Sequence, residues 1–434
     1  MDDARQVIEN GTVLVTGSRI ACVGSCDASR ADRVVDLSGK TVMPGIMDMH
    51  MHFGRPSGGF IPPQSWEIAR YLAYGTTAGR EPADWPEHNV PLKELIDAGR
   101  VVGPRTFVVG GIMNSWSFGG YDLVQLLRGD VAINRSTFHD IPDLATARDE
   151  IDRIIRWVGE GVALKNYYQG ARDRRQWLVH AARERGITVT AEDDDLYYNL
   201  GYVMDGNAGF EHGIRNLPVL KDAATFLGQA GVVYSATMSA GTGQQRGKEY
   251  WLQVLDVWKD PKARLWQPWQ AFIPAQRRRV KRPLTDYRYP LYAQGIADVI
   301  AEGGYGAIGS HGEIAGPASH YEVWMHAAAM SPMQALEVAT RHAAYFLGAE
   351  QDLGSIEVGK LADLIVLNQN PLDDIRNTLD LAYVMKGGRL YEDDTLNEIW
   401  PESRPYGPRP WVNEGMLRMD ERSIDYHDKK RGSR

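Results

Sequence analysis

"TVMPGIMDMHMHFGRP", residues 41–56, places two histidines, His50 and His52, at the end of a short apolar run. Side chains at positions i and i+2 of a strand point to the same face. The two imidazoles can therefore converge on one point, as two ligands of one metal ion do. A pair of surface histidines after a strand is the alternative interpretation. The stretch predicts a buried strand that ends at a polar site.

The composition excludes several classes of protein. The chain has 434 residues and a net charge of −8, which argues against a nucleic-acid surface. It has no apolar run of about 18 residues, so no membrane span is expected. Its start, "MDDARQVIENG", lacks the apolar segment of a signal peptide, and a cytoplasmic location is expected. Cys22 and Cys26 are too few for a disulfide framework or a cysteine zinc site, and we interpret them as small strand or turn residues.

The middle of the chain, residues 46–349, alternates short apolar runs with amphipathic segments. "VALKNYY" (162–168), "RRQWLVHAARERG" (174–186) and "ITVTAED" (187–193) are examples. This repeat predicts a parallel sheet, and the number of units favours a closed (β/α)8 TIM-like barrel. A doubly wound open sheet is the alternative, but no glycine-rich phosphate-binding motif follows any predicted strand.

The two ends of the chain read as short strands separated by turns. We expect residues 1–45 and 350–395 to form one small split β-sandwich domain, with the barrel of residues 46–349 inserted between them. Residues 396–434 are rich in proline and charge, and we expect them to form an extended C-terminal tail.

Polar residues close several predicted barrel strands. Lys165 closes "VALK", and Thr190 and Glu192 close "ITVTAED". His212 closes "GFEHG", and His311 closes "GAIGSHGE". A lysine at the end of an apolar strand is unusual, because burial of an unpaired ammonium is costly. Active sites of these barrels lie at the C-terminal ends of the strands. The recurrence of polar residues at the ends of several predicted strands therefore predicts a catalytic site.

Two segments resemble the amidohydrolase superfamily. "TVMPGIMDMHMH" (41–52) resembles its first-strand HxH motif, and "GSIEVGKLADLIVL" (354–367) resembles its returning β-sandwich segment. The sequence as a whole is most similar to the imidazolonepropionase-like and prolidase-like branch of this superfamily. The resemblance implies a metal-dependent hydrolase of amide-type bonds with one or two divalent ions, zinc first, with manganese or iron as alternatives.

The resemblance also implies a ligand set. His50 and His52 would bind the first metal and His212 the second. Lys165 matches the lysine that family members carboxylate with CO2, and its carbamate would bridge two ions. A hydroxide held between two such ions is a strong nucleophile near neutral pH.

Two positions depart from the family pattern. Thr190 stands where the family has a strand-five histidine, so Glu192 would supply a carboxylate as metal ligand or proton shuttle, unless it belongs to an exposed acidic turn. His311 stands where the family has an aspartate, and it would bind a metal or act as general base. Three hypotheses follow. The first is a two-metal enzyme with Glu192 in place of a histidine, and the second is a one-metal enzyme using His50, His52 and His311. The third is a family member with little or no bound metal that catalyses a reaction other than amide hydrolysis, such as cyclisation or decarboxylation.

Four residues are candidates for substrate binding. Arg55 follows the HxH motif, and Arg80 lies near the second strand end. Either would hold a substrate carboxylate, or form an ordinary salt bridge. Tyr167 follows the fourth predicted barrel strand and is expected to line the open end of the barrel that holds the active site. His320 follows the strand-eight loop and is a candidate to reach the same site, with a structural role on its helix as the alternative.

The segment "SHYEVWMH" (319–326) also contains Glu322 and His326. Its spacing differs from that of an HExxH zinc helix. The two residues are four apart, so we expect them to pair on one helix face.

The expected substrate is a small molecule, either a small peptide or an N-acyl amino acid, and a homo-oligomer is expected. The alternatives are a lactone or cyclic-imide hydrolase, a non-hydrolytic cyclase or decarboxylase with an altered metal centre, and a non-catalytic scaffold barrel. The candidate ligands at several strand ends favour an enzyme over a scaffold.

Overall fold

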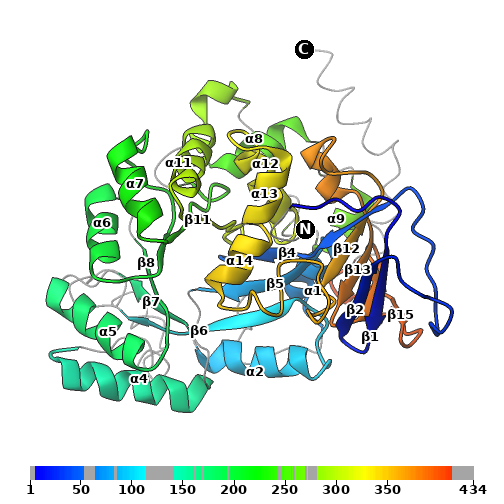
Figure 1. The fold of residues 1–434 in the computed structure, drawn as a ribbon, viewed down its shortest axis with the longest axis horizontal. Helices are drawn as coiled ribbons and strands as arrows, with labels where there is room; N and C mark the ends of the chain where they lie inside the picture. Colours follow the sequence, from blue (N-terminus) through cyan, green and yellow to red (C-terminus); the bar gives the residue numbers. More distant parts are fainter. Residues whose placement is uncertain are drawn as a thin grey trace.

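The computed structural model of the chain describes residues 5–52, 64–82, 86–113, 141–159, 163–167, 171–192, 195–241, 246–255, 257, 260–268, 271 and 281–412. Its centre is a parallel sheet of eight strands that neighbour one another in chain order (Figure 1). These strands are β4 (Ile46–Asp48), β5 (Thr76–Glu81), β6 (Arg105–Met113), β7 (Ala163–Tyr167), β8 (Val189–Glu192), β9 (Gly209–Glu211), β10 (Val233–Ser235) and β11 (Tyr305–Gly306). The predicted fold class, a TIM-like barrel with a second β domain, is confirmed.

Backbone hydrogen bonds just beyond the first and last strands close the barrel. The Met49 amide donates to the Ile308 carbonyl at 2.9 Å. The His311 amide donates to the His50 carbonyl at 2.7 Å. These bonds join the segment after β4 to the segment after β11. As a result, two histidines that are far apart in the sequence become neighbours at one end of the barrel.

Helices cover the outside of the barrel. In α4 (Leu144–Val158), Asp143 caps the first turn by accepting a hydrogen bond from the Thr146 amide. Ala147, Ile151 and Ile154 follow the helical spacing and belong to one buried cluster with Leu164 of β7. The other α-helices are α1 (Trp66–Ala73), α2 (Pro86–Asp97), α5 (Arg172–Glu184), α6 (Leu196–Met204), α7 (Lys221–Gln229), α8 (Gly247–Val254), α9 (Pro261–Leu265), α11 (Tyr289–Ala301), α12 (Pro317–His326), α13 (Pro332–Val338) and α14 (Arg341–Phe346).

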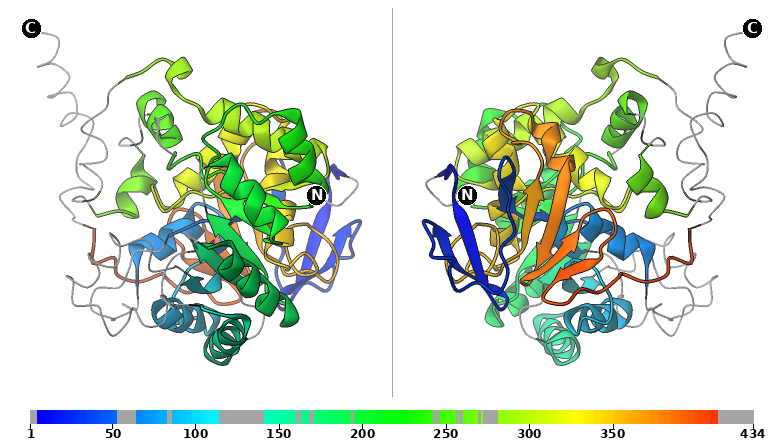
Figure 2. Two further views of the ribbon diagram at one scale, coloured as in Figure 1. Left: turned by 90° about the vertical axis from the view of Figure 1, so that its left-hand side faces the viewer. Right: turned by 90° about the vertical axis from the view of Figure 1, so that its right-hand side faces the viewer.

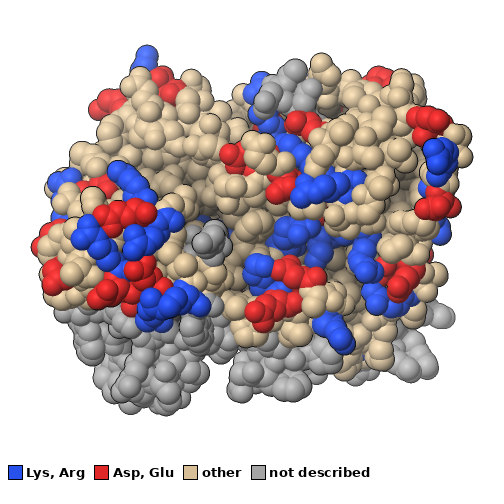
Figure 3. Space-filling model, turned by 60° about the horizontal axis from the view of Figure 1, so that its bottom comes forward, with Lys and Arg blue, Asp and Glu red and all other residues tan. Residues whose placement is uncertain are grey.

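The outer surface mixes both signs of charge. Acidic and basic side chains are interspersed on the face shown in Figure 3. Between α4 and α5, for example, Arg148 pairs with Glu184 at 2.7 Å and Arg185 with Asp152 at 2.8 Å. Exposed pairs of this kind contribute little stability. Within the described ranges, no helix has the length and apolar character needed to cross a bilayer.

Strands from both ends of the chain form a second sheet, in the order β15-β14-β13-β12-β3. The right-hand view of Figure 2 shows the N-terminal strands in blue beside the C-terminal strands in orange. Five strands make this sheet: β3 (Thr41–Pro44), β12 (Leu364–Leu367), β13 (Leu381–Lys386), β14 (Arg389–Glu392) and β15 (Glu398–Trp400). Strand β15 extends the sheet into the segment predicted as a tail, of which residues 413–434 lie outside the described ranges.

A separate hairpin, β1 (Thr12–Thr16) with β2 (Arg19–Gly24), packs against this sheet. Ile20 of the hairpin shares a buried cluster with Leu364 and Val42 of the sheet. Cys22 and Cys26, which we interpreted as small strand or turn residues, are joined by a disulfide at the end of the hairpin.

Gly45 connects β3 to β4 and therefore links the two domains. A Cβ at this position would lie 2.0 Å from the Thr77 Oγ1 atom and 2.3 Å from its Cγ2 atom, in a fully buried environment. We expect Gly45→Ala to lower the free energy of unfolding by about 1–3 kcal/mol, measured by urea denaturation. Gly201→Ala, in helix α6 with its nearest neighbour atom at 3.7 Å, is the control and should be neutral or stabilising. Equal losses in the two variants would contradict the packing argument.

Candidate active site

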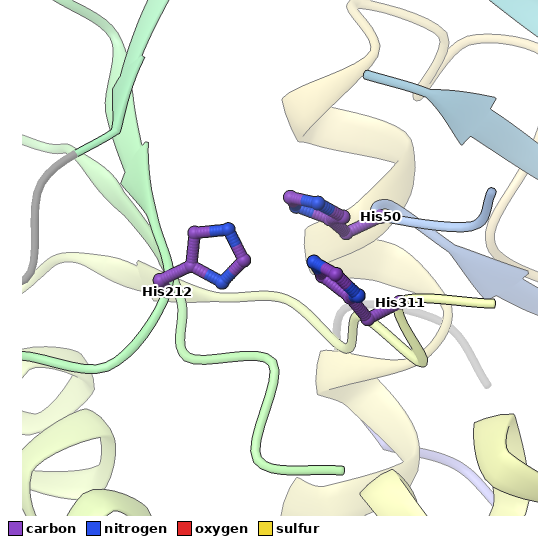
Figure 4. Close-up of side chains that lie close together, drawn as sticks. All are labelled: His50, His212 and His311. Atoms are coloured by element: carbon purple, nitrogen blue, oxygen red, sulfur yellow. The ribbon is translucent and has the colours of Figure 1, made fainter. Parts of the chain in front are cut away.

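Three histidines converge at the carboxyl ends of the barrel strands. One nitrogen atom each from His50, His212 and His311 lies within 4.8 Å of the other two. Figure 4 shows the His212 ring facing the other two rings across the site. The rings of His50 and His311 stack with their centroids 4.9 Å apart. Three imidazole nitrogens in this arrangement are a donor set suited to zinc and similar ions.

His50 has a buried nitrogen that is open to a ligand. Its Nδ1 atom lies 2.7 Å from the Glu211 Oε2 atom. Its Nε2 atom is buried and has no hydrogen-bond partner among the described residues. Burial holds the pKa of His50 well below its usual value, so the ring is neutral. A neutral imidazole with a carboxylate at one nitrogen and a free second nitrogen is the usual state of a metal ligand.

The backbone is strained at this site. His212, Thr237 and His311 have φ values of 69°, 45° and 59°. These are three of the six non-glycine residues with positive φ in the described part of the chain. Such conformations cost about 1–3 kcal/mol each and concentrate at functional sites. The strain is therefore independent support for a functional centre here.

Asp48, within the HxH stretch, holds the two histidine-bearing segments together. Its carboxylate accepts hydrogen bonds from the Ser310 amide at 3.1 Å, the His50 amide at 3.2 Å and the Ser319 hydroxyl at 2.7 Å. Sequence reasoning missed this residue. The available signal was an acidic residue within the otherwise apolar run "GIMDM", since a buried carboxylate requires hydrogen-bond donors.

A buried cluster of charges lies beside the histidines. The Lys165 ammonium contacts the Glu192 carboxylate and lies 3.3 Å from Glu211 Oε2. Arg80 donates to Glu211 and to the Thr190 hydroxyl, both at 2.7 Å. Thr190 in turn donates to Glu211 at 2.7 Å. Burial raises the pKa of Glu211, but Arg80 and Lys165 outweigh it and hold the pKa well below its usual range. Two carboxylates and two cations thus balance one another.

Thr190, one of the two departures from the family pattern, and Glu192, its expected substitute, both lie in this cluster. Thr190 is a hydrogen-bonding partner of Arg80 and Glu211. Glu192 lies inside the site, with its Oε1 atom 3.0 Å from His212 Nε2. Burial raises the pKa of Glu192, but His212 and Lys165 outweigh it and lower the pKa to about 2. Glu192 is therefore an ionised carboxylate beside the histidines and is only 7% exposed.

The rings of His52 and His311 are in contact at the open end of the barrel that holds the site. His52 Nδ1 lies 2.8 Å from Glu81 Oε1, and its ring meets the His311 ring edge to face at 4.6 Å. His52 thus lies next to the three clustered histidines, with one nitrogen occupied by a carboxylate. Burial lowers the pKa of His311 to about 3, so its imidazole is neutral and available as a ligand, but it is a weak base.

Two predicted substrate contacts are corrected by the structure. Arg80 is 2% exposed and pairs with Glu211, so it supports the site from inside the barrel instead of holding a substrate. His320 is fully buried on α12, with Nε2 2.7 Å from the Tyr74 carbonyl oxygen. Burial lowers its pKa to about 4. Arg55 and the side chain of Tyr167 lie outside the described residues.

Glu322 has a different partner from the one expected. The His326 ring contacts the backbone oxygen of Glu322 at 2.8 Å, so the predicted carboxylate pair is wrong. The Glu322 carboxylate instead accepts a hydrogen bond from the Ser239 amide, in the turn after β10. Burial raises the pKa of Glu322 to about 8.

Comparison with known proteins is consistent with this geometry. Residues 297–391 match the amidohydrolase family. The ochratoxinase of Aspergillus niger is 22% identical over 92% of this chain and 86% of that protein. A solved Xaa-Pro dipeptidase is 22% identical, with a TM-score of 0.67 over 90% of this chain and 97% of that chain. A solved molinate hydrolase is 18% identical, with a TM-score of 0.66 over 93% of this chain and 94% of that chain.

The family match and the similarity to ochratoxinase together support assignment of the chain to the amidohydrolase superfamily. They likewise support an enzyme of the amidohydrolase class.

The buried acid Glu322 gives a test of these electrostatics. Its pKa is about 8 in the folded state against an ordinary value of 4.5, so the folded state retains a proton that the unfolded state releases. The contribution of Glu322 to stability should therefore fall as pH rises from about 5 to 8, by a few kcal/mol in order of magnitude. Glu322→Gln retains an acceptor for Ser239 but does not ionise. Urea denaturation at several pH values should show the stability of the wild type falling relative to that of this variant over this range, and parallel profiles would contradict the assignment.

Proposed function

We propose that the chain is a metal-dependent hydrolase that cleaves an amide-type bond in a small peptide or an N-acyl amino acid. The observation that carries the proposal is the convergence of His50, His212 and His311, with a buried nitrogen of His50 that has no partner among the described residues. The similarity to an Xaa-Pro dipeptidase supports a peptide as substrate.

The residues present fit one divalent ion. His50, His212 and His311 would hold it, and the Glu192 carboxylate lies close enough to His212 to join them. Zinc is expected first because imidazole and carboxylate are among its preferred ligands, with manganese or iron as alternatives. When bound, the ion would polarise the substrate carbonyl and acidify a water molecule.

The chain's own residues would move the proton. The Lys165 ammonium contacts Glu192 and favours its ionised form, so we infer that this carboxylate accepts the proton that water loses as it adds to the carbonyl carbon. The same carboxyl group would return the proton to the leaving nitrogen as the C–N bond breaks. His311 borders the same space and is the alternative base, although burial makes its ring a weaker base than an ordinary imidazole.

A carbamate at Lys165 stays a prediction. The Lys165 ammonium is paired with Glu192 and Glu211, and a carbamate in its place would put a third anion beside two carboxylates. This arrangement does not fit a carbamate in the absence of bound metal ions. Carboxylation of Lys165 is therefore expected only together with metal loading.

Metal content tests the ligand assignment. We expect about one ion per chain by mass spectrometry, and two ions would favour the two-metal hypothesis. His212→Ala should lose most of the metal along with the activity, because it removes one of the three clustered donors. His180→Ala is the matched control, since His180 lies on α5 with its side chain 60% exposed. Full metal content in the His212 variant would place this residue outside the ligand set.

The reaction is tested with a panel of dipeptides, N-acyl amino acids, lactones and cyclic imides in the presence of Zn2+, Mn2+ or Fe2+. Amide substrates should turn over. Exclusive turnover of lactones or cyclic imides would overturn the proposed substrate class. Release of CO2 or ring closure would indicate the non-hydrolytic alternative, and absence of both turnover and metal would indicate a scaffold.

Carbon-13 NMR with labelled bicarbonate tests the state of Lys165. A carbamate signal is expected in the metal-loaded protein and not in the metal-free protein, with Lys165→Arg as control. A strong signal without metal would contradict the argument from the two carboxylates.

Partners and location also stay proposals. We propose a small-molecule substrate, no nucleic-acid or membrane partner and a homo-oligomeric state, which light scattering would test. The predicted cytoplasmic location has one observation against it, because the Cys22–Cys26 disulfide is of a kind that persists in oxidising compartments.

A further inference from the structure

A lysine lies at the edge of the candidate active site, on the segment that follows β10. Lys248 is in the first turn of α8, and its amide donates to the Ser239 carbonyl at 3.4 Å. Ser239 belongs to the turn in which the Thr237 Oγ1 atom lies 2.6 Å from His212 Nδ1. The start of α8 is therefore attached to the carboxyl end of β10, next to the clustered histidines.

An acidic residue comes to the same edge from the segment after β11. Glu313 follows His311 by two residues, so the Cα atoms of the two residues are within about 8 Å of each other. Gly312, between them, packs against the HxH segment, because a Cβ there would lie 2.8 Å from the His52 carbonyl oxygen. Glu313 is thus also at the open end of the barrel.

The charges of the described side chains at this edge do not balance. The Glu313 carboxylate contacts the Lys248 ammonium and also lies 3.2 Å from Arg246 Nη1, so two cations share one carboxylate. Glu249, in the same turn of α8, is exposed and offsets the excess charge only weakly. The side chains of Lys248 and Arg246 are 14% and 51% exposed, so a small molecule can reach both. This edge of the site therefore favours an anionic group.

The proposed substrates carry such a group close to the bond that is cleaved. In a dipeptide or an N-acyl amino acid, only the amide nitrogen and one carbon atom separate the cleaved carbonyl from the carboxylate. The residue that binds this carboxylate must therefore lie near the clustered histidines. Arg80, which we expected in this role, is paired with Glu211 inside the barrel. Lys248 has the charge, the access and the position that the role requires, and a charge-assisted hydrogen bond to a carboxylate is a strong one.

We propose that Lys248, assisted by Arg246, binds the carboxylate of the substrate and so restricts the enzyme to substrates with a free carboxylate. The lysine ammonium has three donors, so it can bind this group while it remains close to Glu313. The inference deepens the proposed function and rests on it, because the carboxylate belongs to the proposed substrate class. Lys248 determines specificity and takes no part in proton transfer.

A matched pair of substrates tests the role of Lys248. One is the N-acyl amino acid or dipeptide of the panel with the highest kcat/KM, and the other is its C-terminal carboxamide. Lys248→Met should raise KM for the acid about 10–100-fold with little change in kcat, and should leave KM for the carboxamide close to that of the wild type. Lys248→Arg should restore most of the preference for the acid. Lys93→Met is the control, since Lys93 lies on α2 with its side chain 43% exposed.

A purely structural role of the ion pair predicts a different result. Glu313→Gln removes the partner but leaves Lys248 charged, so this variant should bind the acid at least as tightly as the wild type. Equal losses on both substrates in Lys248→Met and Glu313→Gln would overturn the proposal, as would an unchanged KM for the acid in Lys248→Met. If the methionine variant fails to fold, Arg246→Gln should give a smaller rise in KM for the acid alone, and no rise would count against the proposal.

Failure of the proposed function can be told apart from failure of this inference. If no amide of the panel is cleaved, the proposed function fails, and calorimetry with N-acetylleucine and its carboxamide then measures binding without turnover. Tighter binding of the acid by the wild type, lost in Lys248→Met, would support the carboxylate site. Equal binding of the two compounds by the wild type would overturn it.

Discussion

The site depends on the hydrogen bond from the His311 amide to the His50 carbonyl, 2.7 Å long. This bond joins the ends of the first and last strands and sets the distance between two of the three clustered histidines. Gly309 makes the approach feasible, because a Cβ there would lie 2.7 Å from His50 Cβ and 2.8 Å from Thr237 Cγ2. Three strand ends are therefore packed so closely that only a residue without a side chain fits between them.

This closure brings neutral rings and buried charges into one compartment. Glu211 links the two groups, since its carboxylate lies against His50 and also receives Arg80 and Lys165. Removal of a single partner would leave an uncompensated charge in a medium of low polarity, which is far more costly than loss of a surface pair. The charged residues thus depend on one another. This explains why Thr190, in place of a metal-binding histidine, is still an integral part of the site.

The sequence was sufficient for the fold and for the region of the site, because strand periodicity and the barrel rule place strand-end residues together. It was insufficient for Arg80 and His320, whose roles depend on how deeply the tertiary structure buries them. Glu211 shows a different obstacle. It precedes His212 directly, and consecutive strand residues point to opposite faces. The positive φ of His212 interrupts that alternation at the end of β9, so both side chains reach the same compartment.

The distribution of strain argues for catalysis over a scaffold role. His212, Thr237 and His311 adopt left-handed backbone conformations that glycine or asparagine would adopt at lower cost. A barrel that served only as a scaffold would be more stable without these conformations and without a buried imidazole nitrogen that lacks a partner in the part of the chain that the structure describes. The same features become useful when a ligand occupies the space between the three rings, because rigid donors then need no rearrangement to bind it. The energetic cost of the site is thus concentrated at the atoms that would contact a bound ion.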